Sequence, residues 1–267
     1  MEKIIELKNI NTKEALLDFA EKKGMSHKIG YHYTSLQGLR GIYNSEEFWF
    51  KNTRVQNDLD ESYNNFRNDA NKFLYTASFC HCSEENLGQW YMYGDAGNGF
   101  RIEVDLTHIV AQVRKSVKFV DCDNKEQLIE NDDYSVCIAD VIYYEIQDNK
   151  CILFYDGEQN INFNASDFND IRREKPYFKE KIWAPEQETR ILIYLKQECA
   201  SRIINRGGMN DNAFLLTTVN KNVSYGEVVA GPNTIKNAEV YLPIKRSVCG
   251  GHIGSLVPSR AMITGMI

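Results

Sequence analysis

The segment that most constrains this chain is residues 181–194, KIWAPEQETRILIY, in which acidic residues precede a β-prone run. Its proline ends any preceding helix, and the residues ILIY at 191–194 are typical of a strand. Side chains two positions apart in a strand share a face, so the pattern predicts Glu186, Glu188 and Arg190 together on one side of a sheet. Taken alone, such a pattern is more often a charged edge strand, so its meaning depends on the rest of the chain.

Composition limits the class of protein. The 267 residues suit one large domain or two small ones with a buried core. A net charge of −6 excludes a basic field over the whole molecule, so any surface for nucleic acid has to be local. Seven cysteines at irregular spacing argue against a secreted disulfide framework. Because a signal-peptide pattern and a long apolar run are both missing, we expect a cytoplasmic protein with no membrane partner.

Hydrophobic periodicity and capping residues predict an α+β fold. The expected helices cover residues 11–24, 36–42, 59–73 and 83–93. The expected strands cover residues 28–33, 47–51, 74–80, 99–105, 118–121, 136–146, 186–194 and 226–232. The Asn-rich residues 155–170 are expected to form a loop or insertion. Helices and strands alternate early and strands dominate later, which favours an α+β arrangement over a regular βαβ array.

Three places outside the opening segment carry candidate site residues. His32 ends a strand where a helix starts, and backbone N–H groups at such a junction favour polar ligand groups, although a lone His beside aromatics is more often structural. Tyr91 and Tyr93 lie about 160° apart around a short helix, so only one of them can face a ligand. Arg54 beside Asn57 is either a solvated turn or a phosphate contact.

Two further motifs concern metal ions and polyanions. Cys80-His81-Cys82 would bring both sulfurs to one face of a strand, but no second Cys/His pair at zinc-finger spacing is present, so we expect no metal. The chain also lacks the Gly-x-Gly-x-x-Gly and P-loop motifs, and therefore both standard phosphate-binding loops. The basic segment 172–181, RREKPYFKEK, is either a solvated face or a contact for a polyanion.

Several short motifs occur in an order that resembles a known family. They are His32-Tyr-Thr34, Asn57-Asp58, Ser78-Phe79, Trp90-x-x-Tyr93-Gly94, Glu186-x-Glu188-x-Arg190 and Gly231-Pro232. Together they resemble a large bacterial domain family of unknown function, which is distantly similar to the ADP-ribosyltransferase superfamily in its His–Tyr–Glu form. Members of that family occur in toxin–antitoxin and phage-defence settings. The resemblance covers about residues 29–235.

The resemblance implies an ADP-ribosyltransferase-like split antiparallel β-sheet core with peripheral helices. It implies a catalytic domain over residues 28–245, an N-terminal helical extension over 1–27 and a C-terminal tail over 246–267. The implied activity is NAD-dependent mono-ADP-ribosyl transfer to a macromolecule, by a toxin or anti-phage effector. NAD is then a co-substrate, no metal takes part, and an antitoxin is an implied partner.

The same resemblance implies a role for each matched residue. Glu188 would hydrogen-bond the nicotinamide ribose and stabilise the oxocarbenium ion formed as nicotinamide leaves, with Glu186 as the second catalytic carboxylate. His32 would bind the adenosine ribose, and Arg54 would bind the diphosphate. The residues implied to contact NAD are His32, Tyr33, Thr34, Arg54, Asn57, Ser78, and Tyr91 or Tyr93. Tyr33 departs from the superfamily, in which Gly usually follows the histidine.

The acceptor is the partner on which the sequence says least. The basic segment leads directly into the two glutamates and carries aromatic side chains suited to unstacked bases, which slightly favours single-stranded nucleic acid, RNA in particular. The expected contacts are Arg172, Arg173, Lys175, Tyr177 and Lys179. A transferase that modifies protein is one alternative. A non-catalytic nucleotide-binding or sensing module with a structural Glu188, and a protein-interaction domain with a tyrosine-rich interface, are the others.

Overall fold

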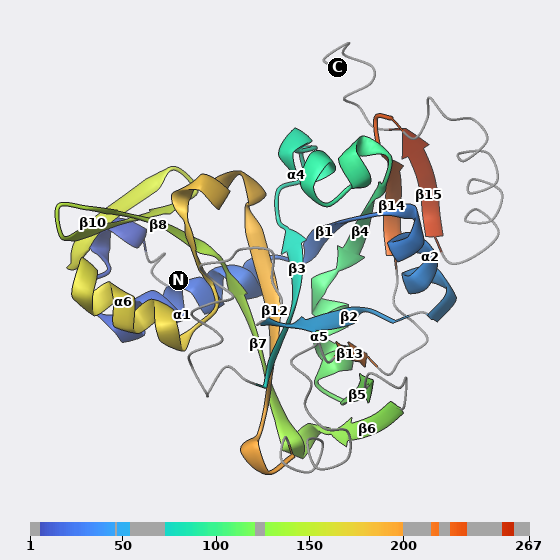
Figure 1. Ribbon diagram of the computed structural model, residues 1–267, viewed down its shortest axis with the longest axis horizontal. Coiled ribbons are helices and arrows are strands. Elements are labelled where there is room, and N and C mark those ends of the chain that lie inside the picture. Colours follow the sequence, from blue (N-terminus) through green and yellow to red (C-terminus); the bar gives the residue numbers. More distant parts are fainter. Residues whose placement is uncertain are drawn as a thin grey trace.

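Two β-sheets organise the computed structural model of the chain, with helices around them (Figure 1). The structure describes residues 6–45, 47–53, 73–120, 126–199, 215–218, 225–233 and 253–258. The larger sheet has 11 strands and the smaller has four. Antiparallel neighbours predominate in both. Within the described residues the fold is therefore α+β, as the sequence predicted.

The larger sheet divides at one of its strands. Its strands are β1 (Ile29–Thr34), β2 (Trp49–Asn52), β3 (Leu74–Cys80), β4 (Phe100–Asp105), β5 (Ser116–Val120), β6 (Glu126–Glu130), β7 (Tyr134–Asp140), β12 (Glu188–Leu195), β13 (Leu215–Thr218), β14 (Tyr225–Ala230) and β15 (Ile253–Pro258). The order is β15-β14-β4-β1-β3-β2-β13-β5-β6, and β12 joins β3 to β7. Strand β3 pairs with β12 along its whole length, and also with β1 at Cys80 and with β2 at Tyr75 and Thr76. Because β3 has three partner strands, the sheet splits there.

The smaller sheet continues from the larger one through a bend. Its strands are β8 (Ile142–Gln147), β9 (Lys150–Tyr155), β10 (Glu158–Asn164) and β11 (Phe178–Glu180), in the order β10-β9-β8-β11. The single strand expected over residues 136–146 is therefore wrong, because Val141 separates β7 from β8. The Val141 N–H donates to the Glu188 carbonyl at 2.8 Å. Val141 and Ile142 are both fully buried, so the hydrophobic pattern runs through the bend without a break.

The loop expected over residues 155–170 is also wrong. Strand β10 and helix α6 (Ala165–Glu174) occupy most of this segment. Its asparagines make hydrogen bonds within regular structure. The Asn164 side chain caps α6 by accepting the N–H of Asp167, and the buried Asn160 amide donates to the carbonyls of Leu7 and Ile10. The asparagine side chains of this segment therefore form a helix cap and long-range hydrogen bonds, where the sequence had suggested turns.

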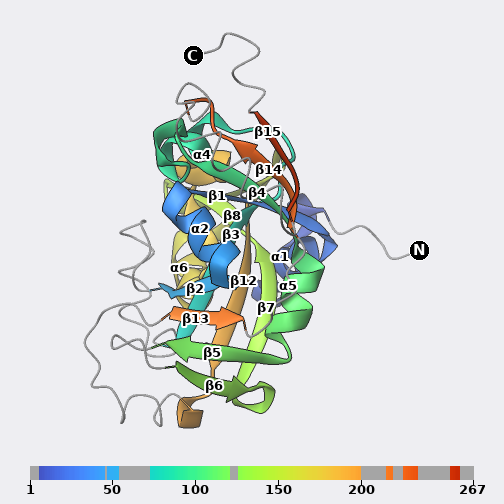
Figure 2. The ribbon, with the colours of Figure 1, turned by 90° about the vertical axis from the view of Figure 1, so that its right-hand side faces the viewer.

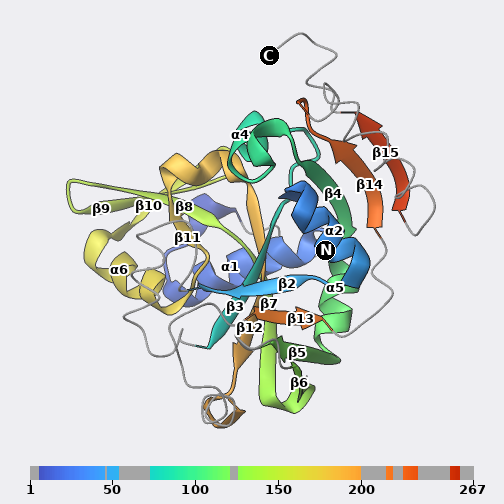
Figure 3. The same cartoon turned by 45° about the vertical axis from the view of Figure 1, so that its right-hand side comes forward.

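Helices cover the sheets on several sides (Figures 2 and 3). The other helical elements are η1 (Leu7–Asn9), α1 (Lys13–Ser26), α2 (Leu36–Ser45), α4 (Leu87–Met92), η4 (Asp95–Gly97), α5 (Leu106–Val113), η5 (Asn131–Asp133) and η6 (Lys181–Glu186). Helices α2 and α5 lie beside β1 and β4 (Figure 2), and both contribute side chains to one hydrophobic core. Residues 59–72 of the helix expected at 59–73 lie outside the described residues. Among the described helices, none is long and apolar enough to cross a membrane.

Strand β12 separates two hydrophobic cores. Ile191 belongs to the core that contains residues of α2 and α5, whereas Leu192 belongs to the core between α1 and the smaller sheet. Successive side chains point to opposite faces of a strand, so β12 is buried on both faces. This explains why its sequence is a continuous apolar run where a strand with one solvated face would alternate.

The segments expected to flank the catalytic domain both take part in this arrangement. Helix α1, within residues 1–27, buries Leu16 and Phe19 in the second core. Strand β15, within residues 246–267, pairs in parallel with β14 at the edge of the larger sheet. Thr12 caps α1 by accepting the N–H of Ala15 at 3.2 Å.

Candidate functional site

A cavity of about 580 Å³ lies where the larger sheet divides. Its walls come from β1, α2, β2, β3, α4, β11, η6 and β12. The lining residues that the sequence marked as site residues are His32, Tyr33, Thr34, Ser78, Tyr93, Lys179, Glu186 and Glu188. Further lining residues include Phe48, Trp49, Lys51, Met92, Trp183 and Arg190. Residues from both halves of the chain thus meet around one cavity.

Two buried carboxylates and two buried cations form the charged wall of this cavity. Glu186 is 2% exposed and Glu188 is 4% exposed. The Lys179 Nζ lies 2.6 Å from Glu186 Oε2 and 2.9 Å from Glu188 Oε2, so it bridges the two. Arg190 donates two hydrogen bonds to Glu188, from Nε to Oε1 at 2.7 Å and from Nη2 to Oε2 at 3.0 Å. Bidentate pairing of this kind fixes the orientation of a carboxylate as well as its charge.

The two carboxylates converge through a turn, not through a shared strand face. Glu186 ends η6, and Glu188 is the first residue of β12. Gln187 between them is left-handed, with φ 44° and ψ 58°. The expectation that Glu186 lies in the strand is therefore wrong, whereas Glu188 and Arg190 do share a face. The turn redirects the chain so that Glu186 still reaches Lys179.

Helix α4 holds Glu186 from the other side. The Tyr93 hydroxyl donates to Glu186 Oε1 at 2.6 Å, and the Gln89 side chain donates to the Glu186 carbonyl at 3.1 Å. Tyr91 is 57% exposed and does not line the cavity. Of the two tyrosines that the sequence left open, Tyr93 is the one at the site.

Burial and neighbouring charges push the pKa values of the two carboxyl groups in opposite directions. For Glu186, burial and the adjacent Glu188 carboxylate raise the pKa, and the Lys179 ammonium only partly offsets them. For Glu188, burial would also raise the pKa, but Arg190 and Lys179 outweigh burial and hold the pKa well below its usual range. Glu188 is therefore ionised at neutral pH, whereas Glu186 is the stronger base.

His32 adds a neutral acceptor to the cavity. Its Nδ1 lies 3.2 Å from the Ser78 carbonyl, and a carbonyl only accepts, so Nδ1 carries the proton and Nε2 is an acceptor. Burial lowers the pKa of His32, and the Ser78 carbonyl and Lys51 modify that shift in opposite directions. The ring sits edge-on to Phe48, with centroids 5.4 Å apart. This arrangement suits a ligand hydroxyl that donates to Nε2.

Tyr33 holds a helix in place beside the site. Its ring packs edge-to-face on Trp90, with centroids 4.9 Å apart, and its hydroxyl accepts the N–H of Asn86 at 3.2 Å. Asn86 is the N-cap of α4. Tyr33 therefore ties β1 to the N-terminus of α4, the helix whose C-cap is Tyr93.

The exposed basic and aromatic track expected along residues 172–181 is wrong in its geometry. Tyr177 is fully buried, with its hydroxyl 3.3 Å from Glu21 Oε1 as donor. Lys179 points into the carboxylate pair and is 6% exposed. Arg172 is half-buried over the Tyr144 ring, 5.2 Å from its centroid. The aromatic residues of this segment, Tyr177 and Phe178, are buried in the core. Their rings therefore cannot stack on bases in this conformation.

The remaining predicted contacts lie elsewhere or outside the described part of the chain. Arg173 is exposed and pairs with Asp170, and the half-buried Lys175 lies over the Tyr194 ring. Arg54 and Asn57 fall outside the described residues. The sequence did not predict that Lys179 bridges Glu186 and Glu188. Lys179 lies seven positions before Glu186, and no local pattern links residues at that spacing.

The chain was compared with protein families, curated proteins and solved structures. No family model, curated protein or solved structure matches the chain. The site is therefore interpreted from its own residues: an ionised carboxylate, a second carboxylate of raised pKa, a tyrosine and a neutral histidine around one cavity.

Proposed function

We propose that this chain is an NAD-dependent mono-ADP-ribosyltransferase built on an ADP-ribosyltransferase-like split sheet. The observation that carries the proposal is the convergence of His32, Tyr93 and Glu188 on one cavity from three separate elements. The motif resemblance assigns the same three residue types to the NAD site. A volume of about 580 Å³ also lies within the range of small-molecule and cofactor sites.

The reacting bond in this proposal joins C1′ of the nicotinamide ribose to the pyridine nitrogen. As it breaks, its electron pair leaves with nicotinamide, which departs neutral, and the ribose becomes an oxocarbenium ion. Glu188 would meet this positive charge, because its lowered pKa keeps it ionised. Arg190 and Lys179 hold it in a fixed orientation before the reaction, so little reorganisation is needed.

Glu186 would act on the acceptor. A nucleophilic oxygen or nitrogen of the acceptor forms the new bond to C1′ and must lose a proton. Glu186 has the raised pKa expected of a general base, and Tyr93 and Lys179 orient its two oxygens. The two carboxylates would thus have separate roles. Glu188 would stabilise the oxocarbenium ion, and Glu186 would take the proton from the acceptor.

The acceptor in this proposal is a macromolecule whose class is left to the experiment. A preference for RNA requires an exposed basic and aromatic track along residues 172–181, and Tyr177 and Lys179 of that track are buried. Protein and nucleic acid therefore enter the test on equal terms. A toxin or anti-phage role, with an antitoxin as partner, rests on the motif resemblance alone.

A nucleotide-binding module without catalysis is the second candidate, and one observation favours it. Both oxygens of Glu188 already take part in bonds to Arg190 or Lys179. A carboxylate neutralised in this way can serve structure alone. Turnover separates the two candidates, because a binding module holds NAD without releasing nicotinamide.

The deciding experiment measures nicotinamide release and label transfer from NAD labelled in its adenylate part. Wild-type protein incubated with lysate protein, total RNA or denatured DNA is expected to label one class of acceptor. Glu188→Gln is expected to lower this rate by about 10²-fold or more, because it removes the charge that faces the oxocarbenium ion.

Glu180→Gln is the matched control, since Glu180 is exposed on β11 next to Lys179. It is expected to leave the rate within twofold of wild type, a difference of about 0.4 kcal/mol. Circular dichroism checks that both variants are folded. NAD binding without any nicotinamide release by wild-type protein would support the binding module instead, and a fully active, folded Glu188→Gln protein would rule out the transferase assignment.

A further inference from the structure

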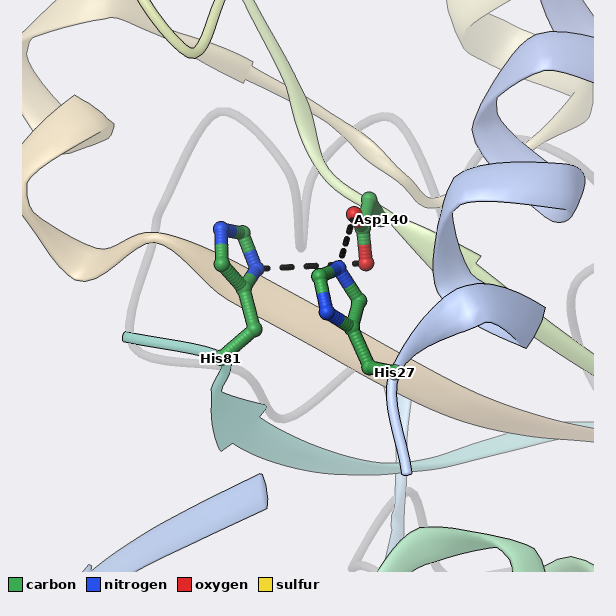
Figure 4. Close-up of side chains that lie close together, drawn as sticks. All are labelled: His27, His81 and Asp140. Atoms are coloured by element: carbon green, nitrogen blue, oxygen red, sulfur yellow. Dashed lines mark hydrogen bonds and ion pairs between the residues drawn. The ribbon is translucent and has the colours of Figure 1, made fainter. Parts of the chain in front are cut away.

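Behind β12, on the side away from the cavity, two histidines and an aspartate come together (Figure 4). His27 follows the last residue of α1, His81 follows β3, and Asp140 ends β7. The Thr189 hydroxyl points toward this cluster, whereas its neighbours Glu188 and Arg190 point into the cavity. The alternation of β12 thus places the cluster on the opposite face of the strand from the candidate active site.

The donor atoms of the cluster are those that zinc-class ions prefer. One nitrogen of each histidine and an oxygen of Asp140 all lie within 4.8 Å of one another. His27 Nε2 is 2.8 Å from Asp140 Oδ2, and His81 Nδ1 is 3.9 Å from Asp140 Oδ1. Imidazole nitrogens with a carboxylate oxygen form a common three-residue set for zinc, with a water in the fourth position.

The surroundings of His81 add a second carboxylate to the cluster. The His81 side chain is 9% exposed, with its Nδ1 3.2 Å from Thr189 Oγ1 and its Nε2 3.8 Å from Asp156 Oδ1. The His27 and His81 rings are also stacked, with centroids 4.5 Å apart and planes within 4°. A buried carboxylate beside two imidazoles, with a second carboxylate at Asp156, is a place where a cation would be stabilised.

We propose that His27, His81 and Asp140 bind a divalent cation of the zinc class. The ion takes the position of the proton between His27 Nε2 and Asp140, and the neutral His27 ring then carries its single proton on Nδ1. The His81 ring turns about its Cβ–Cγ bond as the ion enters, because two parallel stacked rings cannot both direct a nitrogen at one ion.

The surroundings of Asp140 are those of an oriented metal ligand. The Tyr155 hydroxyl donates to Oδ2 at 2.7 Å, and the Thr189 hydroxyl donates to Oδ1 at 2.5 Å. Such bonds fix a ligating carboxylate while leaving lone pairs for the ion. The expectation of no metal considered only Cys80-His81-Cys82, and Cys80 lines the cavity on the other side of β12 instead.

The bound ion would join the N-terminal helix to the sheet. It would cross-link the end of α1, the end of β3 and the end of β7, three segments that are distant in sequence. The site is independent of the proposed transferase activity, so its test does not use NAD.

The experiment titrates Zn²⁺ into EDTA-treated, dialysed protein and follows heat and thermal unfolding. We expect one Zn²⁺ per chain and a rise in Tm of about 5 °C or more at 100 times the Kd. Affinity is expected to fall in acid, because protons compete with the ion for the imidazole nitrogens. His27→Ala and His81→Ala are each expected to weaken binding at least about tenfold, since each removes one of three protein ligands.

His108→Ala is the matched control, because His108 lies on α5 outside the cluster, with its Nε2 3.3 Å from Gln112. It is expected to bind Zn²⁺ like wild type. His81→Gln is a second variant in case His81→Ala fails to fold, and circular dichroism in EDTA checks both. No stoichiometric binding by wild type, or equal Zn²⁺ affinity in the folded His27 and His81 variants, would overturn the proposal.

Discussion

At the scale of residues, four charged side chains share one buried site. Lys179 and Arg190 balance Glu186 and Glu188, so the group has no net formal charge. Buried charges are tolerated when each is paired and hydrogen-bonded, and removing one partner leaves another without compensation. This explains how two adjacent carboxylates fit at the edge of a hydrophobic core.

The same site predicts a pH dependence of stability. The pKa of Glu188 in the folded chain is lowered from 4.5, so its contribution to stability is present above pH 4.5 and is lost as the pH falls toward the folded pKa. We expect Glu188→Gln to flatten the loss of folding free energy below pH 4.5, measured by urea denaturation between pH 3 and about 6.

Two further variants test the sign of this effect. The pKa of Glu186 is raised, so its favourable contribution is present below pH 4.5 and is lost as the pH rises through the folded pKa. Glu186→Gln should therefore keep the acid loss of wild type. The exposed Glu180→Gln should follow wild type throughout. An acid profile of Glu188→Gln identical to wild type would contradict the assigned direction.

At the scale of elements, the junction of η6 and β12 positions the two carboxylates. Gln187 adopts φ 44° there, a region that costs a side-chain-bearing residue about 1–2 kcal/mol. Its carbonyl accepts the N–H of His81 at 2.9 Å, and its own N–H donates to Ala184 at 3.2 Å. These two bonds hold the turn that brings Glu186 to Lys179.

Substitutions at Gln187 test this turn. Gln187→Gly is expected to change the free energy of unfolding by less than about 1 kcal/mol, because relief of strain offsets the greater freedom of the unfolded chain. Gln187→Val should destabilise by more than about 1–2 kcal/mol, because a β-branched residue is disfavoured at positive φ. Chemical denaturation measures both.

The control is Gln159→Val, the same substitution at an exposed position of β10. It is expected to lie within about 0.5 kcal/mol of wild type, since surface changes in regular strands have small effects. Equal stability of the Gln187 and Gln159 valine variants would show that the turn is not strained.

At the scale of the whole molecule, helix α1 packs directly on the central sheet. A Cβ added at Gly24 would lie 2.6 Å from the Cα of Ala139 on β7. This close approach brings His27, three residues on, to Asp140. The N-terminal helix is therefore held by backbone-to-backbone contact, and the proposed ion would reinforce that contact.

A pair of glycine substitutions tests this docking. Gly24→Ala is expected to destabilise by about 1–3 kcal/mol, because the added methyl group overlaps β7. Gly41→Ala on α2 is the control, because nothing lies within 4 Å of its added Cβ. It should stabilise by about 0.5–1 kcal/mol through helix propensity. Thermal and urea unfolding measure both, and a stabilising Gly24→Ala would mean that α1 is not packed as described.

The sequence by itself determined part of the local elements and the identity of several site residues. The strand at residues 99–105 and the shared face of Glu188 and Arg190 follow from hydrophobic period and spacing. These are short-range properties, since they depend on residues a few positions apart. The motif order likewise marked His32 and Tyr93, which line the same cavity.

Tertiary structure alone decided which of these residues meet and which way the chain turns between them. Val141 bends the chain between two sheets, and no change in hydrophobicity marks the bend. Lys179 faces inward because Glu186 and Glu188 lie there to neutralise it. His27 and Asp140 are 113 positions apart. Hydrophobic periodicity predicts that one face of an element is buried, but it does not predict which element packs against that face. Contacts between residues far apart in sequence, such as His27 and Asp140, therefore form only when the sheets and α1 are assembled.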